Sequence, residues 1–524
     1  MSRLSFILLL TACARDADGD GFASDVDCDD TRADVNPGAR ERAGNGVDDD
    51  CAPETCLQGG FVDAPERWSL PEGYGGGELE PFPMSNVFNP DCEDDPTLPY
   101  AALHDITGDG ILDLVIPRTC DDAVPMTEWW VHVGTSSGYA ADRTVWTLPP
   151  SYAVDDAPFD DAGGRATGRC EADRHVPSYG LFDLTGDGVA DLVVTSSCDD
   201  PTIGQTAWRV HAGGAAGYAA EATRWALPSG YGGAGTTPFM LYNMNGSCDE
   251  DGPYWFVADV NADRVYDLVI VYMCGEPSSV GRTEWLVHDG GAAGFAEAAR
   301  SWALPSSYVD AGSLGFPRVS STNPVCEGDT VSYTWTSLFV DGDDYLDLVV
   351  THDCSNPDVG DTRWLLHAGG PDGFAATAED WSLPAEFGVD GATPFVSNYA
   401  PWCDPPTGTP GFLVTEWDGA LEADLLVFAT CTEPDQGWRL FPGGPGGFGA
   451  AVSLSRPDTV ADGFGVVDSL ASSQASCGSE PTQSAWEVLD LDGDGLYDLV
   501  VFDVCEDDEL GVTHWMYYAG ACDL

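Results

Sequence analysis

A short aspartate-rich motif recurs six times along the chain, and its regular spacing limits the fold more than any other feature. The last aspartate of each copy lies at residue 113, 191, 267, 347, 424 or 498, so consecutive copies are 74 to 80 residues apart. An apolar run such as Leu192–Val194 follows each aspartate and is typical of a buried strand. A fixed period that carries a strand signature predicts a repeat architecture.

In its complete form the motif is a tight loop with oxygen-bearing side chains at positions one, three, five and nine and glycine at position six. This alternation converges several oxygens on one centre and suits a hard cation such as Ca²⁺. The complete copies are Asp105, Thr107, Asp109 and Asp113; Asp183, Thr185, Asp187 and Asp191; and Asp490, Asp492, Asp494 and Asp498.

Three copies depart from this form. Asp259, Asn261, Asp263 and Asp267 keep the ligand positions, but Arg264 replaces the glycine, which disfavours the turn and adds a positive charge. The copies that end at Asp347 and Asp424 have lost more of the motif, and we expect them to bind no cation.

Each repeat also carries the patterns of further strands. After the loop and its strand comes a run such as Thr127–His132, in which apolar and polar residues alternate. A Gly-rich turn with Gly-Tyr or Gly-Phe follows, and then a Trp with a Pro three residues later, at Trp68, Trp146, Trp225, Trp302 and Trp381. About four short strands per repeat are typical of one propeller blade.

The two ends of the chain complement each other. The chain stops after the third strand of a repeat, and residues 56–71 supply a fourth strand that has no first three before it. Joined together, the two ends make one complete unit. The sequence therefore predicts an all-β fold, a six-bladed β-propeller of four-stranded blades over residues 56–524, closed by the amino-terminal strand.

The D-x-[TDN]-x-D-G-x-x-D-L-V-V core of the repeat resembles that of the FG-GAP and VCBS repeat proteins over residues 57–524. These are calcium-loop β-propellers that include the integrin α-subunit head. The resemblance implies that the Asp loop joins the first and second strands of each blade and that the complete loops bind Ca²⁺. Six blades, where integrin-type propellers usually have seven, and a regular cysteine are departures from that family.

The amino terminus has the features of a bacterial lipoprotein signal. Arg3 precedes an apolar run, Leu4–Leu10, that is too short to span a bilayer. The sequence Leu10-Thr11-Ala12-Cys13 resembles a lipobox. The resemblance implies removal of residues 1–12, a lipid on Cys13, and anchoring to the outer membrane on its periplasmic or outer side, since Ala14 follows the cysteine. An incidental cysteine beside a signal peptide remains the alternative.

Residues 13–55 form an acidic segment that is poor in apolar residues. Its loop places Asp16, Asp18, Asp20, Ser24 and Asp27 at positions one, three, five, nine and twelve, close to an EF-hand loop. Continuing to Cys51, the segment resembles the MopE-type metal-binding motif, although Gly44 stands where that family usually has a cysteine and Ala52-Pro53 follows the last cysteine. The segment is either a calcium-stiffened tether or a site for another metal.

The cysteines indicate an oxidising compartment and a regular set of disulfides. Apart from Cys13, sixteen cysteines remain, and six pairs have nearly the same offset in successive repeats: Cys92–Cys120, Cys170–Cys198, Cys248–Cys274, Cys326–Cys354, Cys403–Cys431 and Cys477–Cys505. Cys28–Cys51 and Cys56–Cys522 are the remaining expected pairs. With the strand order above, each repeat bridge would join the long inter-blade loop to the turn after the second strand, on the face opposite the Asp loops.

Composition and missing motifs exclude several functions. A formal net charge of −68 disfavours binding to nucleic acid or anionic lipid, although it is also what a solvated surface in a salty habitat requires. All 20 basic residues are arginine, so Schiff-base chemistry and a phosphate-binding-loop lysine are excluded. The sequence contains no HExxH motif, and its one GxSxG match, Gly134–Gly138, lies in a Gly-rich turn and is not a nucleophile elbow. The four histidines at one repeat position, His132, His211, His288 and His367, indicate a structural role.

The preferred interpretation is a non-enzymatic, calcium-stabilised surface lipoprotein, monomeric and held to the membrane only by its lipid, that binds a glycan or protein ligand. The expected binding surface is formed by the inter-blade loops, which share little besides their cysteines, and the candidate contacts are Trp335, Trp402, Glu93 and Arg174. Two alternatives stay open. One is an enzyme on a propeller scaffold that acts on extracellular polysaccharide, and the other is a metal-handling protein that works through residues 16–51.

Overall fold

The structure is a computed structural model. It describes residues 58–62, 64–74, 82, 92, 97–152, 159, 165–166, 169–171, 174–232, 237–241, 253–263, 265–273, 279–308, 315–318, 320, 333–343, 345–387, 395, 411–415, 417, 422–429, 438–454, 471–472, 485–504 and 509–522. Nothing before residue 58 is among them, so the lipobox, Cys13 and the loop of Asp16 to Asp27 lie outside the described residues.

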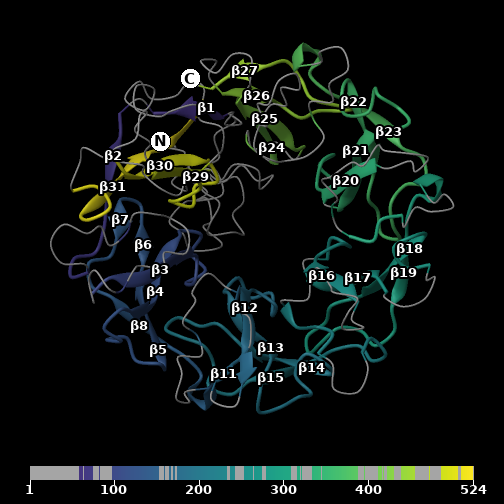
Figure 1. Cartoon of the computed structure of the whole chain (residues 1–524). Coiled ribbons are helices and arrows are strands. Elements are labelled where there is room, and N and C mark those ends of the chain that lie inside the picture. The colour runs from purple at the N-terminus through teal and green to yellow at the C-terminus, as the bar shows by residue number, and fades with distance from the viewer. Residues whose placement is uncertain are drawn as a thin grey trace, which may run out of the picture.

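The described chain forms six antiparallel sheets arranged in a ring around a central opening (Figure 1). This confirms the predicted six-bladed, all-β propeller. Blade one is β3 (Pro99–His104), β4 (Asp113–Thr119), β5 (Glu128–His132) and β8 (Thr144–Thr147). Blade two is β12 (Ser178–Phe182), β13 (Asp191–Ser196), β14 (Ala207–His211) and β15 (Thr223–Ala226). Blade three is β16 (Tyr254–Ala258), β17 (Asp267–Tyr272), β18 (Glu284–His288) and β19 (Arg300–Ala303).

The remaining blades follow the same order. Blade four is β20 (Tyr333–Leu338), β21 (Asp347–Asp353), β22 (Arg363–His367) and β23 (Glu379–Ser382). Blade five is β24 (Gly411–Thr415), β25 (Asp424–Ala429), β26 (Arg439–Phe441) and β27 (Val452–Ser453). Blade six is β29 (Ala485–Leu489), β30 (Asp498–Asp503), β31 (His514–Tyr518) and β2 (Glu66–Ser69). Three single-turn 3-10 helices, η1 (Pro150–Tyr152), η4 (Ser306–Tyr308) and η5 (Ala385–Phe387), follow the fourth strands of three blades.

Blade six is built from both ends of the chain, as the sequence predicts. Strand β2 pairs with β31, and Trp68 lies opposite Trp515. A second contact reinforces this closure, because β1 (Gln58–Phe61) pairs with β32 (Gly520–Cys522). The buried Phe61 packs edge-on against Trp417 and Trp438 of blade five. The N-terminal segment therefore completes blade six and also joins it to blade five.

A glycine-aromatic pair after the third strand joins each blade to the blade before it. In blade two, Tyr218 packs edge-on against Trp129 and Trp146 of blade one. The preceding Gly217 has φ +138°, and a Cβ there would lie 2.4 Å from the Oγ1 of Thr147, so only glycine fits. Tyr139, Phe295, Phe374 and Phe448 make the same contact at other joints, and Phe61 makes it for blade six. The core is thus a ring of apolar clusters that lie between neighbouring blades.

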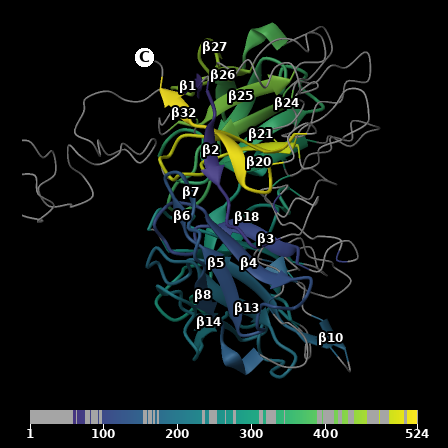
Figure 2. The same cartoon turned by 90° about the vertical axis from the view of Figure 1, so that its left-hand side faces the viewer.

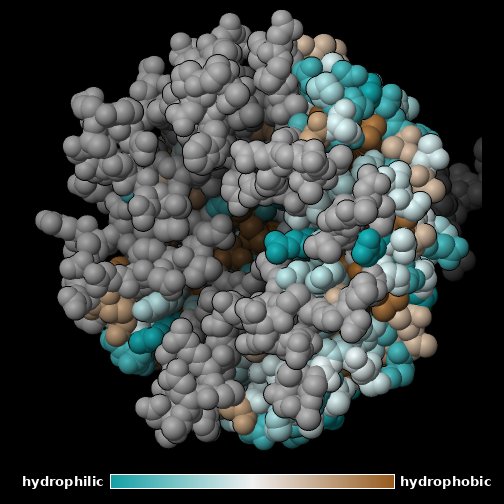
Figure 3. Space-filling view, turned by 45° about the vertical axis from the view of Figure 1, so that its right-hand side comes forward, coloured by the Kyte–Doolittle hydropathy of each residue, from teal (hydrophilic) through white to brown (hydrophobic). Residues whose placement is uncertain are grey.

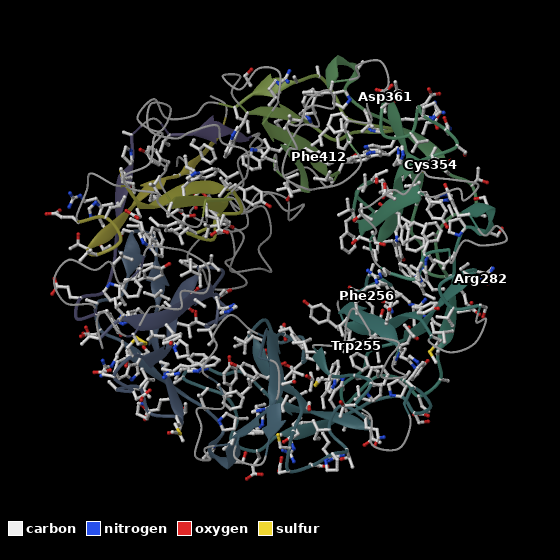
Figure 4. All side chains as sticks on the ribbon, in the orientation of Figure 1. Trp255, Phe256, Arg282, Cys354, Asp361 and Phe412 are labelled. Carbon is white, nitrogen blue, oxygen red and sulfur yellow. A yellow bond between two sulfur atoms is a disulfide. The ribbon has the colours of Figure 1, made fainter. Side chains whose placement is uncertain are left out.

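Two short strands extend blades at their inner edges. β9 (Arg165–Ala166) pairs with β12, and β28 (Ala471–Ser472) pairs with β29. A separate hairpin joins β10 (Arg169–Glu171) and β11 (Arg174–Val176), and β6 (Gly134–Thr135) pairs with β7 (Gly138–Tyr139). Hydrophobic side chains are visible inside the hollow of the ring (Figure 3). Phe256 and Phe412, on the innermost strands, lie on the side of the opening, whereas Arg282 lies near the outer rim (Figure 4).

The ring has two distinct faces, which Figure 2 shows edge-on. In blade one, His104 pairs with Asp113 at the end of the hairpin that carries the Asp loop, and Pro99 pairs with Thr119 at the other end. We name these the cation-loop face and the inter-blade-loop face. Six residues of strand separate them, about 20 Å. Among the described residues, none belongs to a helix with the length and apolarity needed to cross a membrane.

Candidate cation-binding site

The Asp loops lie between the first and second strands of their blades, as the family resemblance implies. In blade one the position-one carboxylate of Asp105 organises the turn. Its Oδ1 accepts the N–H of Gly108 at 2.7 Å and its Oδ2 accepts the N–H of Gly110 at 2.9 Å. Asp183 holds Gly186 and Gly188 in the same way, at 2.7 and 2.8 Å. The loops therefore have the compact shape that brings side-chain oxygens together.

The position-nine aspartate has a further role that the sequence does not reveal. Oδ2 of Asp113 accepts the N–H groups of Ile106 and Thr107, while Oδ1 accepts the N–H of Gly134 beyond the third strand, at 2.8 Å. The same bond to a glycine after the third strand is made by all six position-nine residues, Asp113, Asp191, Asp267, Asp347, Asp424 and Asp498, each fully buried. This aspartate clamps the loop to the third strand in complete and degenerate copies alike, which explains why it persists in all six.

Burial raises the pKa of these carboxyl groups, because the charged form loses its hydration. The pKa rises to about 6 in Asp113 and Asp347, about 7 in Asp267 and about 8 in Asp498. In Asp498 the negative charge of Asp492 adds to the effect of burial, while backbone N–H donors act in the opposite direction. The loops thus hold negative charge that the fold alone compensates only in part.

Blade six has the most enclosed of the complete loops. One carboxylate oxygen from each of Asp490, Asp492 and Asp494 lies within 4.8 Å of the others. Asp492 is 7% exposed and Asp494 is 5% exposed, whereas Asp109 and Asp187 are exposed. The buried hydroxyl of Tyr517 donates to Oδ2 of Asp492 at 2.6 Å. Three carboxylates so close together repel each other, and this all-oxygen set fits a hard divalent cation.

Blade four departs from the sequence expectation. The sequence predicts no cation in the loop that ends at Asp347, because this copy has lost more of the motif; Phe339 stands at its position one. In the structure one oxygen from each of Asp341, Asp343 and Asp347 lies within 4.8 Å of the others. Oδ1 of Asp341 is buried and accepts no hydrogen bond within the described part of the chain. These three carboxylates therefore fit a cation. They supply positions three, five and nine of the motif, and the position-one ligand is missing.

In blade three, Asp259, Asn261, Asp263 and Asp267 retain the loop, and Ala262 adopts φ +59°, in the left-handed region. Arg264 lies outside the described residues, so its effect on the turn stays a prediction. Another arginine of the same blade, Arg300, lies near the loop. Its Nη2 is 3.9 Å from Oδ2 of Asp267, and its Nε donates to Asp289. This blade thus has a positive charge of its own near the position-nine carboxylate.

The inter-blade-loop face carries the disulfides at its described positions. Cys92 and Cys120 are bonded, with a Cα–Cα distance of 5.2 Å, which confirms this predicted pair. Cys198 and Cys354 are also disulfide-bonded. Their expected partners, and the pairs at Cys28–Cys51, Cys248–Cys274, Cys403–Cys431 and Cys477–Cys505, involve residues outside the described side chains. For Cys56–Cys522, the backbone of Cys522 lies in β32 beside β1.

The residues predicted to contact a ligand are placed differently. Trp335 is 7% exposed, packs in the core between blades three and four, and donates from Nε1 to the carbonyl of Arg318. Its ring has no exposed face for a ligand, so we leave Trp335 out of the binding surface. Trp402 and Glu93 lie outside the described residues, and Arg174 is described only by its backbone in β11.

A sequence signal for the core position of Trp335 does exist. Tyr179, Trp255, Phe412 and Trp486 occupy the equivalent place in the first strands of other blades, opposite the equivalent residue of the second strand. Each lies twelve residues before the last aspartate of its loop. Because the aromatic type varies at this position, Trp335 looks unrepeated although it belongs to a repeated row.

Comparison with known proteins supports one part of the sequence interpretation directly. The family model "Cu-binding_MopE: Putative metal-binding motif" matches residues 27–55. No curated protein matches the chain. The chain is similar to a solved structure of the Photorhabdus luminescens Tc holotoxin pore, with 14% identity and a TM-score of 0.45 over 90% of this chain, and it spans only 15% of that chain.

Two further solved structures are similar at lower scores. BBS1N in complex with ARL6DN has 10% identity and a TM-score of 0.26, with 84% of this chain and 97% of that chain covered. The Vibrio cholerae biofilm matrix protein Bap1 has 12% identity and a TM-score of 0.19, with 89% of each chain covered. The sheets of the chain itself form a propeller, and the family model places a metal-binding motif of the MopE type before it.

Proposed function

We propose that this protein is a non-enzymatic, calcium-stabilised surface lipoprotein whose propeller binds a glycan or protein ligand through its inter-blade-loop face. The observation that carries the proposal is the separation of two specialised ends on one hairpin. The Asp loop 105–113 lies at one end of β3 and β4, and the Cys92–Cys120 disulfide lies at the other. The cation-loop face is suited to rigidity that depends on a bound cation, and the inter-blade-loop face is suited to presenting loops to a ligand.

The cation-loop face supports the stabilising half of the proposal. Asp490, Asp492 and Asp494 would hold the ion in blade six, and the corresponding side chains would hold it in blades one and two. A bound Ca²⁺ supplies positive charge that offsets the repulsion among these carboxylates. Because the loop joins the two innermost strands and is clamped by Asp498 to the third, relief of this repulsion stabilises the whole blade.

The position of the N-terminal strand supports the orientation that we propose. β32 follows β31 at the cation-loop end of blade six, where Gly520 donates to Asp498. Since β1 pairs with β32, the chain reaches the propeller from this side. A lipid on Cys13 would therefore attach the molecule through its cation-loop side, and the inter-blade loops would point away from the membrane.

The test uses the full chain and a binding screen against a glycan array and isolated cell-surface fractions in calcium. Exchanging the tips of two or three inter-blade loops for Gly-Ser segments, while keeping every cysteine, is expected to abolish binding and leave the melting temperature unchanged. Equal exchanges in exposed turns between third and fourth strands, such as 215–216, serve as the control. Binding that survives the loop exchange would contradict the proposal.

The MopE-type match favours a second candidate, a metal-handling protein that works through its N-terminal segment. The two proposals differ in which deletion removes function. If deletion of residues 14–55 abolishes tight copper binding and every surface interaction while the loop exchange has no effect, the propeller is only a scaffold for the N-terminal segment.

A further inference from the structure

The three complete Asp loops are neighbours in the ring, because blade six lies beside blade one and blade one beside blade two. Their backbones touch. A Cβ on Gly493, at position four of the blade-six loop, would lie 2.2 Å from the carbonyl oxygen of Gly110 in the blade-one loop. A Cβ on Gly108, at position four of the blade-one loop, would lie 2.6 Å from the carbonyl oxygen of Gly188 in blade two. The loops thus form one continuous arc across the seam where the ring closes.

Within the described part of the chain, the arc ends at blade two. Gly186 holds position four of the blade-two loop with the same φ of +75° as Gly108 and Gly493. A Cβ on Gly186 would have no described atom within 4 Å. In the next loop Arg264 takes the place of the position-six glycine. Among the described residues, the backbone contact therefore connects the loops that are complete and has no counterpart at Gly186, since Arg264 lies outside them.

Each contact point is attached to a position-one carboxylate. Asp490 accepts the N–H of Gly493, and Asp105 accepts the N–H of Gly110, whose carbonyl packs on Gly493. Asp105 also accepts the N–H of Gly108, which packs on Gly188, and Gly188 donates to Asp183. A shift of the Asp105 carboxylate therefore moves both Gly108, which touches the blade-two loop, and Gly110, which touches the blade-six loop.

We propose that the Asp loops of blades six, one and two bind cations cooperatively, coupled through the Gly493–Gly110 and Gly108–Gly188 backbone contacts. This rests on the proposed cation sites and adds their regulation. A loop that is already ordered by a cation offers its neighbour a fixed backbone surface. The neighbour therefore loses less conformational entropy when it binds its own cation. Coupling of this kind is reciprocal, because each site must change the other's affinity by the same factor.

The test is hydrogen exchange with mass spectrometry on the full chain across a Ca²⁺ titration. This gives a separate protection midpoint for the peptides that contain loops 105–113, 183–191 and 490–498. The substitution Asp187→Asn removes the negative charge of a blade-two ligand and leaves all the glycines in place. We expect it to raise the midpoint of loop 105–113 about fivefold or more, and Asp109→Asn to raise that of loop 183–191 by the same factor. The protection midpoint of the blade-four loop, residues 339–347, should not shift with either variant.

Two glycine substitutions isolate the contact. Gly108→Ala and Gly186→Ala require the same unfavourable left-handed backbone conformation, but of the two only Gly108→Ala meets described atoms of a neighbouring loop. In the Gly108→Ala background, Asp187→Asn is expected to leave the midpoint of loop 105–113 unchanged, whereas in the Gly186→Ala background the fivefold shift remains. If Gly108→Ala fails to fold, the aspartate variants alone decide the question.

The outcomes separate the two proposals. Protection midpoints that do not change when the neighbouring loop is substituted would overturn the coupling and leave calcium binding intact. An equal shift in the blade-four loop would do the same. Loops that gain no protection from calcium at any concentration would overturn the cation sites and the coupling together.

Discussion

Nε2 of His132 lies 2.9 Å from the hydroxyl oxygen of Tyr74, which ties the third strand of blade one to the segment after the fourth strand of blade six. The other ring nitrogen, Nδ1, lies 2.8 Å from the carbonyl oxygen of Ala140. A carbonyl only accepts, so Nδ1 carries the proton, Nε2 accepts, and the Tyr74 hydroxyl donates. The four repeated histidines are thus structural, as the sequence indicates. Each pairs with a tyrosine that follows the last strand of the preceding blade, and we call such a His–Tyr pair a latch between two blades.

The same latch joins Tyr152 to His211, Tyr231 to His288 and Tyr308 to His367, at 3.3, 2.7 and 3.0 Å. At the joint between blades four and five both partners have changed together, and Phe387 packs on Phe441 with ring centroids 5.7 Å apart. A polar pair and an apolar pair therefore fill the same place.

This exchange predicts the outcome of a substitution cycle. Tyr231→Phe alone should lower the free energy of unfolding by about 1–2 kcal/mol, because it leaves a buried Nε2 of His288 without a donor. Tyr231→Phe with His288→Phe should recover most of that loss, since the pair then matches Phe387 and Phe441. Denaturant unfolding at pH 7.5 measures both values. A double variant that loses more unfolding free energy than Tyr231→Phe and His288→Phe lose together would contradict the latch.

The latches also predict acid sensitivity. Burial lowers the pKa of His132, His211, His288 and His367, so the folded protein keeps them neutral. An unfolded histidine gains its proton at about pH 6.5. Below that pH the unfolded state binds more protons, so the stabilisation is complete above about pH 6.5 and is lost as the pH falls.

The melting temperature in saturating calcium should therefore fall between pH 7.5 and pH 5.5, and by less in the Tyr231→Phe, His288→Phe double variant. A melting temperature that is flat over this range, or equal falls in both proteins, would show that the histidines are not held neutral.

In the absence of cations, the buried carboxylates change stability with pH in the opposite direction to the histidines. The pKa of Asp498 is raised to about 8 and that of Asp267 to about 7, so the folded state binds more protons than the unfolded state above pH 4. Their contribution is present at low pH and is lost as the pH rises through these folded values. Calcium removes this loss in the loops that it fills, and its binding releases protons.

The gap in melting temperature between calcium and chelator should accordingly be wide at pH 8 and narrow at pH 6. Because the histidines are the same in both conditions, their effect cancels in the difference. A gap that is constant with pH would show that the buried carboxylates are not linked to the cation sites.

Some of this fold could be derived from the sequence and some could not. The blade count and the closure through Trp68 follow from the repeat period and from two ends that complete one unit, and the structure confirms both. The blade-four carboxylates were missed because Phe339 removes the first position, by which the motif is recognised, while Asp341 and Asp343 still converge. The loop-to-loop contact at Gly108 depends on the spacing of neighbouring blades, which no single repeat encodes.

The remaining bridges can be checked directly. Cys92–Cys120 is formed, and Cys198 and Cys354 are bonded, so peptide mapping without reduction should find Cys170–Cys198 and Cys326–Cys354, then the other pairs at the same offset. Closing a loop of this length is worth about 3.5 kcal/mol as an upper figure in the chain-entropy model. Pairs that cross between blades, or several free thiols, would contradict the assignment.

We expect closure of the ring to depend on Phe61. Its side chain is 2% exposed and packs against Trp417 and Trp438, so Phe61→Ala should cost about 3–5 kcal/mol. Phe448→Ala removes the equivalent ring at a joint inside the chain and is the matched control. We expect only Phe61→Ala to make residues 58–69 sensitive to limited proteolysis, and equal sensitivity in the two variants would contradict the closure role.

The measurement that tests the account most directly is calorimetric unfolding with calcium and with chelator, for the unaltered protein, Asp494→Ala and Asp343→Ala. Asp494 is 5% exposed among converging carboxylates, whereas Asp343 is exposed in a loop without position one. Each filled site adds about 2.7 kcal/mol at a hundredfold excess over Kd. The account predicts a large drop in melting temperature with chelator, and a greater loss of the calcium effect from Asp494→Ala than from Asp343→Ala. One melting temperature for the unaltered protein in both solutions, or equal losses from the two variants, would contradict it.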